Sequence, residues 1–466
     1  MQTRPPVPDR RPRPADSRRR IAALAGAGAL VFGALTTAGA MTGNPAAAQQ
    51  PAPSIDQVSA DHLRQILATD KTARLDSDGK LFYREPIATP AERRAAPSPR
   101  WAKRAVAGAT GPAFQLHSKP GSNRVIYLDF DGHTITGTAW NTNGKPASVN
   151  VGAYDTDGDP ATFSTAEQDV VREVWARVAE DYAPFDVDVT TQEPSAAAID
   201  RSGASDQKYG TRVLIDPGTW YQSDCRCGGV AYVGVYDSTS RHAYYQPALV
   251  FTKGVGTGAK NIAEAASHEA GHTVGLSHDG TSSVGYYAGH GAWAPIMGVG
   301  YSKAISQWSK GEYADANNKE DDFAVIGQNG LSLRTDDHGN TTGAATALTL
   351  GTSVSGVYAS DADVDVFRID LADGMYTFAA DAAAVGADLD IKLQVLDSSG
   401  AVIATADPEA AQTSAATATG LSASINREVV AGRYYLRVDN TGYGNPLNTG
   451  YSTYGSRGAY TVRVTN

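Results

Sequence analysis

Three of the chain's nine histidines lie within eleven positions, in the stretch SHEAGHTVGLSHDG at residues 267–280. His268 and His272 are four residues apart, so on a helix both imidazoles would project from the same face. Gly275 tolerates the left-handed conformation that ends many helices, and a turn there would bring His278 back towards the first two rings. Three nitrogen ligands leave one position of a tetrahedral zinc ion open, as in catalytic zinc sites. The spacing therefore predicts that His268, His272 and His278 bind zinc.

Glu269 follows the first histidine and points in a different direction from it on a helix. Its carboxylate can therefore reach a water molecule on the metal rather than the metal itself. Zinc lowers the pKa of bound water to about 7, and a neighbouring carboxylate can accept the proton as the water attacks a carbonyl. We expect Glu269 to be the general base of a hydrolase. The alternative for the whole motif is a histidine-rich helix end that binds no metal.

The motif HEAGHTVGLSH resembles the elongated zinc signature of the metzincin metallopeptidases. With the aspartate that directly follows it, Asp279, the motif resembles that of the reprolysin (adamalysin-like) branch. The resemblance implies an α/β (α+β) catalytic domain with a mixed, mostly parallel sheet and a zinc-binding helix. It also implies a methionine-containing turn, here APIMGVGY with Met297, which packs beneath the zinc ligands without binding the metal. An ordinary core methionine is the alternative.

The stretch GGVAYVGVYD resembles the edge strand that pairs with an extended peptide substrate in these enzymes. On this resemblance the substrate is aligned by the backbone of five residues, Gly229, Val230, Ala231, Tyr232 and Val233. Exposed edges are normally blunted and this one is not, which favours a substrate over the alternative, a plain edge strand.

Two further residues near the motif have less specific roles. Tyr301 lies four residues after Met297, whereas the catalytic tyrosine of some metzincins lies two residues after the methionine. We therefore expect Tyr301 in the core or in a pocket wall. His290 is expected to be a hydrogen-bonded loop residue, with a role in the substrate pocket as the alternative.

The N-terminus has the order of a secretory signal peptide: six arginines between residues 10 and 20, an apolar stretch to residue 40, and small residues to residue 48. A membrane anchor is the alternative, but the stretch is mostly alanine and glycine and has little hydrophobic drive. We predict a cleaved signal peptide at residues 1–48 and a secreted, extracellular protein. SRRRIAAL loosely resembles a twin-arginine export signal, and the general export route is the alternative.

The remainder of the chain is acidic. Beyond residue 48 it carries 33 basic and 48 acidic side chains, a formal charge of −15. This charge argues against nucleic acid or an anionic membrane as the main partner. We expect protein or peptide substrates, no stable membrane insertion after signal removal, and a monomer.

Residues 49–111 have the composition of a prosegment. A short amphipathic helix is predicted around SIDQVSADHLRQILATD, followed by a Pro/Ala/Arg-rich stretch in which a protease could cut at Arg93-Arg94 or Lys103-Arg104. An ordinary linker is the alternative. No cysteine precedes Cys225, so the prosegment cysteine that silences several metzincins is lacking. Latency would therefore require another ligand or steric blocking of the cleft.

Cys225 and Cys227 are the chain's two cysteines. In an oxidising exterior they can close a small disulfide ring, which we predict; binding of a metal by the pair is the alternative.

Two domains are predicted from the pattern of strands and helices. Residues 112–331 alternate apolar strands with helices and hold the zinc motif, which predicts the α/β catalytic domain. Residues 336–466 read as an all-β sandwich of short alternating strands. The stretches DADVDVFRIDL, DLDIKLQVLDSSGAVIATAD, AGRYYLRVDN and GAYTVRV resemble the bacterial pre-peptidase C-terminal (PPC) domain that accompanies secreted peptidases.

Two groups of aspartates suggest that the chain binds Ca²⁺ in addition to Zn²⁺. They are DTDGDP at residues 155–160 and the aspartates at positions 361, 363 and 365. The glycine of DTDGDP is misplaced for an EF-hand loop, so solvated acidic turns are the favoured alternative.

Together these patterns predict a secreted zinc-dependent endopeptidase with Glu269 as general base. The alternative is a surface-binding or adhesion protein with a degenerate zinc domain. Glu269 favours the enzyme, because a degenerate site has little reason to keep a base beside two ligands.

Overall fold

The structure is a computed structural model that describes residues 60–94, 112–218 and 225–466. The predicted signal peptide, the first part of the prosegment helix and the Lys103-Arg104 pair lie outside the described residues. Within the described ranges, no helix combines the length and apolar character needed to cross a membrane.

The main sheet has seven strands in the order β1-β2-β8-β9-β7-β3-β6. Strands β9, β7, β3 and β6 are mutually parallel, whereas β8 is antiparallel to β9 and β1 and β2 continue the antiparallel part. This confirms the predicted mixed sheet and adds two strands from residues 73–86. The strands run over Ala73–Leu75 (β1), Leu81–Pro86 (β2), Cys227–Tyr232 (β8), Ala248–Phe251 (β9), Tyr209–Asp216 (β7), Arg124–Asp129 (β3) and Asp188–Thr190 (β6).

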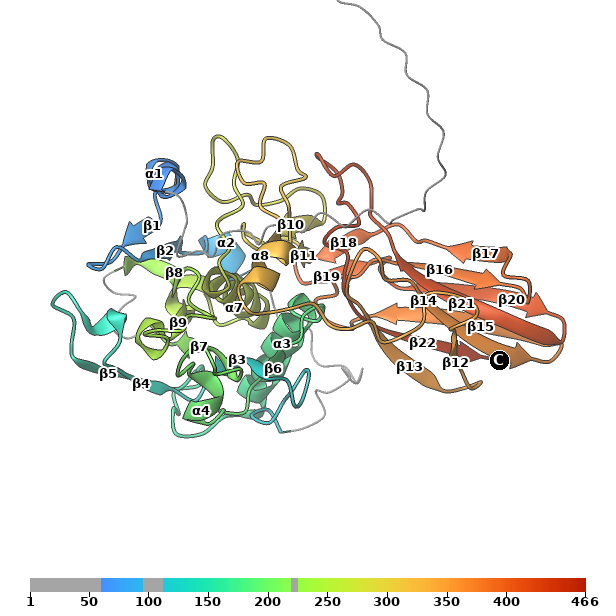
Figure 1. Ribbon diagram of the computed structural model, residues 1–466, viewed down its shortest axis with the longest axis horizontal. Helices are drawn as coiled ribbons and strands as arrows, with labels where there is room; N and C mark the ends of the chain where they lie inside the picture. The colour runs from blue at the N-terminus through green and yellow to red at the C-terminus, as the bar shows by residue number, and fades with distance from the viewer. Residues whose placement is uncertain (1–59, 95–111, 219–224) are drawn as a thin grey trace, which may run out of the picture. The chain divides into compact units, whose positions relative to one another are not determined.

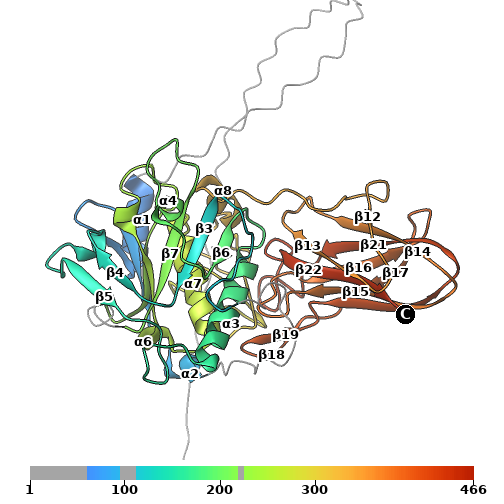
Figure 2. The same cartoon turned by 90° about the horizontal axis from the view of Figure 1, so that it is seen from below.

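Two long helices, α3 (Thr165–Asp181) and α7 (Ala259–Thr273), pack against each other and against this sheet (Figures 1 and 2). Helix α3 begins with the predicted capping box, in which the Ser164 hydroxyl and the Glu167 side chain each bond the other's backbone N–H. Helix α7 carries the first two histidines of the motif and is buried at every position except Glu264. A helix this enclosed holds its side chains rigidly.

Several short elements were not predicted, because three to seven residues give too little periodicity for sequence reasoning. Helix α1 (Ala60–Thr69), which precedes β1, is by contrast the described part of the helix predicted within residues 54–70. The unpredicted strands β4 and β5 form a hairpin. The others are α2 (Pro90–Arg94), β4 (His133–Thr136), η2 (Ala139–Asn141), β5 (Ser148–Val151), α4 (Ala196–Ile199), η3 (Ala243–Tyr245), α6 (Thr252–Val255), β10 (Trp293–Pro295), β11 (Ile305–Gln307) and α8 (Asp322–Gln328).

The C-terminal part is strand-rich, as predicted, and consists mainly of two sheets whose side chains meet in one apolar cluster; their strands are antiparallel except for the parallel pair β12 and β14. In β22 buried and half-buried residues alternate, which is typical of a strand with one core face. The five-stranded sheet contains β12 (Thr346–Ala347), β14 (Asp365–Leu371), β21 (Gly432–Asn440), β16 (Ile391–Leu396) and β17 (Val402–Ala406). The four-stranded sheet contains β13 (Ser353–Tyr358), β22 (Gly458–Thr465), β15 (Gly374–Ala382) and β20 (Ala423–Val429), and a hairpin is formed by β18 (Ala411–Ser414) and β19 (Thr417–Thr419).

Buried carboxylates gather where the end of α3 meets the strand-rich part. The Glu180 carboxylate accepts hydrogen bonds from the backbone N–H of Ala459 at 3.1 Å and of Asp388 at 3.4 Å. Burial raises the pKa of Glu180 to about 8, and burial with neighbouring carboxylates raises the pKa values of Asp181 and Asp388. These groups are therefore protonated in the folded state at a pH where they ionise in the unfolded chain.

We expect the protein to lose stability as pH rises from about 4.5, the ordinary pKa of a glutamate, to about 8. In this range the folded state binds more protons than the unfolded state, so each rise in pH favours unfolding. The thermal midpoint should be higher at pH 5 than at pH 8, and Glu180→Gln should narrow the difference. Glu428→Gln, a change at an exposed position of β20, is the control and should leave the difference as it is.

Candidate metal centre

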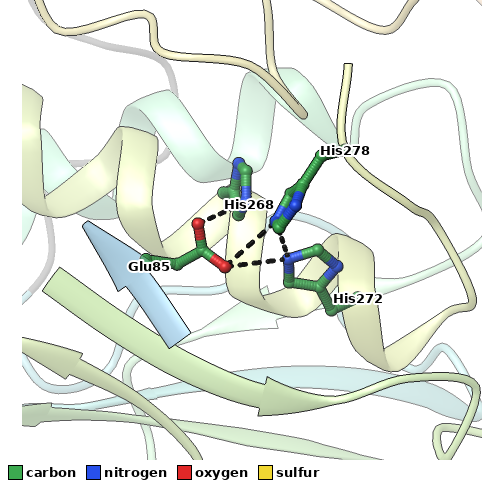
Figure 3. A group of neighbouring side chains, drawn as sticks. All are labelled: Glu85, His268, His272 and His278. Carbon is green, nitrogen blue, oxygen red and sulfur yellow. Dashed lines mark hydrogen bonds and ion pairs between the residues drawn. The ribbon is translucent and has the colours of Figure 1, made fainter. Parts of the chain in front are cut away.

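The three histidines of the motif converge on one point (Figure 3). The Nε2 atoms of His272 and His278 lie 3.0 Å apart, and Nε2 of His268 faces the same space. With a carboxylate of Glu85 they form a buried group whose ligand atoms all lie within 4.8 Å of one another. Ligands of a tetrahedral zinc ion lie about 3.3 Å apart when each is about 2.0–2.1 Å from the metal. The spacing fits one small cation.

The outer nitrogen of each ring already has a partner. Nδ1 of His268 lies 2.9 Å from the carbonyl oxygen of Ile296, and Nδ1 of His272 lies 2.8 Å from that of Leu276. Nδ1 of His278 lies 2.5 Å from a carboxylate oxygen of Asp70. Because all three partners are acceptors, each Nδ1 donates its proton outward and each Nε2 is the nitrogen directed inward. This orientation leaves the three Nε2 atoms as the nitrogens available to a metal.

The end of α7 explains how His278 reaches the other rings. Gly275 has φ = +102°, in the left-handed region, and the backbone N–H of Leu276 donates to the carbonyl of Gly271 while that of Gly275 donates to the carbonyl of His272. This pair of bonds is a Schellman motif, the helix end that glycine favours. The chain reverses there, as the sequence predicted, and returns the third histidine to the helix face.

Glu269 lies beside this group with an unusual environment. Its side chain is fully buried, and neither carboxylate oxygen has a hydrogen-bond partner among the described residues. Burial, and then the charge of Glu85, raise the pKa of Glu269 well above its usual range. A Cβ atom at Gly229 of β8 would lie 1.9 Å from Glu269 Oε1, so only glycine leaves room for this carboxylate.

Met297 and Asp279 contact the zinc motif and each other. Met297 is fully buried, and its Sδ would lie 2.7 Å from a Cβ atom at Gly271, between the two helical histidines. The backbone N–H of Asp279 donates to the carbonyl of Met297 at 2.9 Å, and the Tyr313 hydroxyl donates to the Asp279 carboxylate at 3.3 Å. The methionine thus packs against α7 at Gly271, between the two helical histidines.

Glu85 and Asp70 were missed by sequence reasoning. Glu85 Oε1 lies 3.0 Å from Nε2 of His278 and 3.3 Å from that of His272, and its Oε2 lies 3.4 Å from Nε2 of His268. These contacts span more than 180 residues of sequence, so no local spacing could reveal them. One signal was indirect: without an upstream cysteine, any latency would require a different ligand.

The two carboxylates make the site favourable for positive charge. Burial lowers the pKa of His272 to about 4, but Glu85 and Asp70 overcome burial at His278 and raise its pKa to about 9. Burial alone would raise the pKa of Glu85, whereas the imidazoles of His278 and His268 lower it well below its usual value. A divalent cation in this position would meet the same stabilisation.

The expected open edge at β8 requires correction. Strand β8 contains Gly229, Val230, Ala231 and Tyr232, and Val233 follows it, but β2 pairs with β8 along the side that was expected to be free. Residues 81–86, assigned to the prosegment, therefore occupy the position expected for a substrate. Pairing between strands so distant in sequence left no signal in the β8 sequence itself.

The remaining predicted residues lie close to the site. Tyr301 is buried and lines a small pocket together with Glu85, His268 and Glu269, in agreement with a pocket-wall role. His290 is a hydrogen-bonded loop residue: Nδ1 is 2.7 Å from the Tyr287 hydroxyl and Nε2 is 2.7 Å from the Gly450 carbonyl. Cys225 and Cys227, at the start of β8, are joined in a disulfide.

Two acidic groups lie elsewhere. Asp155, Asp157 and Glu167 form one, and Asp336, Asp363 and Asp365 form the other. In the second, one oxygen each of Asp363 and Asp365 is buried without a hydrogen-bond partner among the described residues.

Comparisons with known proteins give partial similarities. No family model matches the chain, and no curated protein matches it. The pre-peptidase C-terminal domain of a collagenase from Bacillus anthracis is similar to 28% of this chain and is covered to 97%, at 17% identity and a TM-score of 0.19. PliG from Aeromonas hydrophila, a periplasmic inhibitor of g-type lysozyme, is similar to 26% of this chain and is covered to 93%, at 10% identity and a TM-score of 0.17.

Proposed function

We propose that this chain is a zinc-dependent endopeptidase of the metzincin type that acts outside the cell. His268, His272 and His278 would hold Zn²⁺, and Glu269 would be the general base. The observation that carries the proposal is the combination of three inward-facing Nε2 atoms with a buried carboxylate that has no hydrogen-bond partner among the described residues.

The residues divide the work of hydrolysis between them. Bound Zn²⁺ supplies Lewis acidity, which polarises a carbonyl and lowers the pKa of water. Glu269 accepts the proton of the attacking water and can return it to the departing amine. Once β2 has left, the backbone of β8 would provide hydrogen-bonding groups along which an extended peptide can align.

The test is cleavage of a mixed peptide library by secreted protein from which the N-terminal segment has been removed and which has been loaded with zinc. We expect internal peptide bonds to be cut, and we expect 1,10-phenanthroline to stop cleavage and added Zn²⁺ to restore it. A zinc-loaded protein that cuts no peptide in the library would refute the proposal.

One observation favours a second candidate, a binding protein with a closed, structural metal site. In the full chain Glu85 fills the space that a catalytic site keeps open, and four protein ligands are typical of structural zinc. The two candidates differ in the mature protein. If the mature secreted protein retains residues 70–86, the structural site is favoured. If the mature secreted protein lacks them, the peptidase is favoured.

We also predict that Ca²⁺ binds the group formed by Asp336, Asp363 and Asp365. Burial and the neighbouring carboxylates raise the pKa values of Asp365 to about 8 and of Asp363 to about 6, and oxygen ligands of this kind suit Ca²⁺. Millimolar Ca²⁺ should raise the thermal midpoint by several degrees, since a ligand at about 100 times its Kd adds about 2.7 kcal/mol. Asp365→Asn should abolish the shift, and the control Asp157→Asn, in the other acidic group, should retain it. Absence of a shift in the wild-type protein would contradict the prediction.

A further inference from the structure

Residues 70–86, here called the covering segment, lie directly over the three histidines. The segment contains β1 and β2, which pair with each other, and β2 pairs antiparallel with β8. In the register, Tyr83 lies opposite Ala231 and Arg84 opposite Val230. The segment thus runs along β8 as an added strand, the mode in which extended peptides bind to a sheet edge.

The pairing is interrupted at Glu85. Arg84 pairs with Val230 and Pro86 pairs with Cys227, so two residues of β8, Gly228 and Gly229, lie opposite the single residue Glu85. Such a β-bulge redirects side chains relative to a regular strand. Here the Glu85 side chain points at the histidines (Figure 3). A Cβ atom at Gly228 would lie 2.8 Å from the Pro86 carbonyl oxygen, so this close approach depends on glycine.

Other residues of the covering segment complete the enclosure. The Tyr83 ring lies 4.5 Å from the ring of His272, in a stacked arrangement, and 4.0 Å from that of His278. Asp70 holds Nδ1 of His278, and the Tyr286 hydroxyl donates to Thr72 at 3.0 Å. The segment therefore contacts the metal-facing and the outer nitrogens of the same site.

We propose that the covering segment is an intramolecular inhibitor in which Glu85 is the fourth ligand of the metal and β2 takes the place of the substrate on β8. This inference rests on the proposed function, because a blocked site has meaning only if the open site acts on a peptide. While the chain is intact, the effective concentration of the Glu85 carboxylate is millimolar or higher. Hydrolysis of a peptide bond on the C-terminal side of Glu85 makes the segment a separate peptide that can dissociate.

The experiment measures access to the metal without relying on catalysis. The full chain with Glu269→Gln, which cannot process itself, is loaded with Co²⁺ and titrated with acetohydroxamate while the visible absorption of the cobalt is recorded. With Glu85 present, we expect little spectral change. With Glu85→Ala added, acetohydroxamate should bind with an apparent Kd at least about ten-fold lower, because the competing carboxylate is gone.

Two variants guard the comparison. Glu85→Gln keeps the shape of the side chain but removes its charge, and it should also open the site; it carries the test if Glu85→Ala fails to fold. Glu92→Gln is the matched control, because this carboxylate caps α2 by accepting the Thr89 N–H at 2.7 Å and is not part of the metal-binding group. Glu92→Gln should behave like the parent protein.

The outcomes separate this inference from the proposed function. Equal binding of acetohydroxamate with and without Glu85 would overturn the inference, whatever the peptidase activity. If acetohydroxamate enters only the Glu85 variants, but no Glu269-containing protein cleaves a peptide, Glu85 is the blocking ligand and the peptidase function is wrong.

Discussion

In processed, zinc-loaded protein, Glu269→Gln is expected to lower kcat/KM for peptide hydrolysis by about 10²- to 10⁴-fold, the usual contribution of general acid–base catalysis. The amide has nearly the same shape as the carboxylate but cannot accept a proton at neutral pH. Zinc content should stay at one equivalent, because Glu269 is not one of the grouped metal-binding side chains. Initial rates on a fluorogenic peptide and metal analysis of the same samples give both quantities.

The control is Glu428→Gln, the same chemical change at an exposed position of β20 that the processed protein retains, and it should leave the rate unchanged. A Glu269→Gln protein that keeps more than about a tenth of the activity would exclude the general-base role. Loss of zinc together with activity would instead assign Glu269 to metal binding.

Gly229→Ala is the second change with a large expected effect, about 100-fold or more in kcat/KM. The added Cβ atom would lie 1.9 Å from Glu269 Oε1 and 2.7 Å from Glu269 Cδ, so the carboxylate must move. Glu269 is fully buried on a helix that is itself enclosed, so its carboxylate can make room for the added atom only by changing its direction. A displaced base loses its contact with the water that it must deprotonate, because such contacts depend on hydrogen-bond distance.

The double variant Gly229→Ala/Glu269→Gln tests this reason. If alanine acts through Glu269, the double variant should be no slower than Glu269→Gln alone, since two changes to one function are not additive. Gly327→Ala is the matched control: a Cβ atom at this position of α8 meets nothing within 4 Å, and activity should be unchanged. Additive losses in the double variant would show that Gly229 matters for folding rather than for the base.

Sequence reasoning succeeded where the determining interactions are local. The capping box of α3 and the glycine that ends α7 depend on residues a few positions apart, and both occur where the sequence placed them. The spacing of His268 and His272 likewise needs only helical geometry. The mixed sheet and the strand-rich C-terminal part follow from alternating apolar patterns that each strand carries by itself.

The contribution of residues 70–86 could not be predicted in this way. Strand β2 joins a strand about 145 positions later in the chain, and no pattern within LFYREP indicates which strand it pairs with. One signal was overlooked: adjacent glycines at the start of β8 indicate a close approach by another chain segment. Here Gly228 faces Pro86 of β2 and Gly229 faces Glu269 of α7. The two glycines therefore indicated that other segments approach β8 closely, but not which segments these are.

The Nδ1 hydrogen-bond partners of the three imidazoles belong to different parts of the chain, and one of these parts would be removed by processing. His268 and His272 are tethered to the main-chain carbonyls of Ile296 and Leu276, which belong to the motif and the turn below it. His278 is tethered to Asp70, which belongs to the covering segment. Departure of that segment would therefore remove the Nδ1 partner of His278. The rings of His268 and His272 would stay fixed by their hydrogen bonds, and the ring of His278 would be free to rotate. A metal held in this way would exchange with solution through the side of His278.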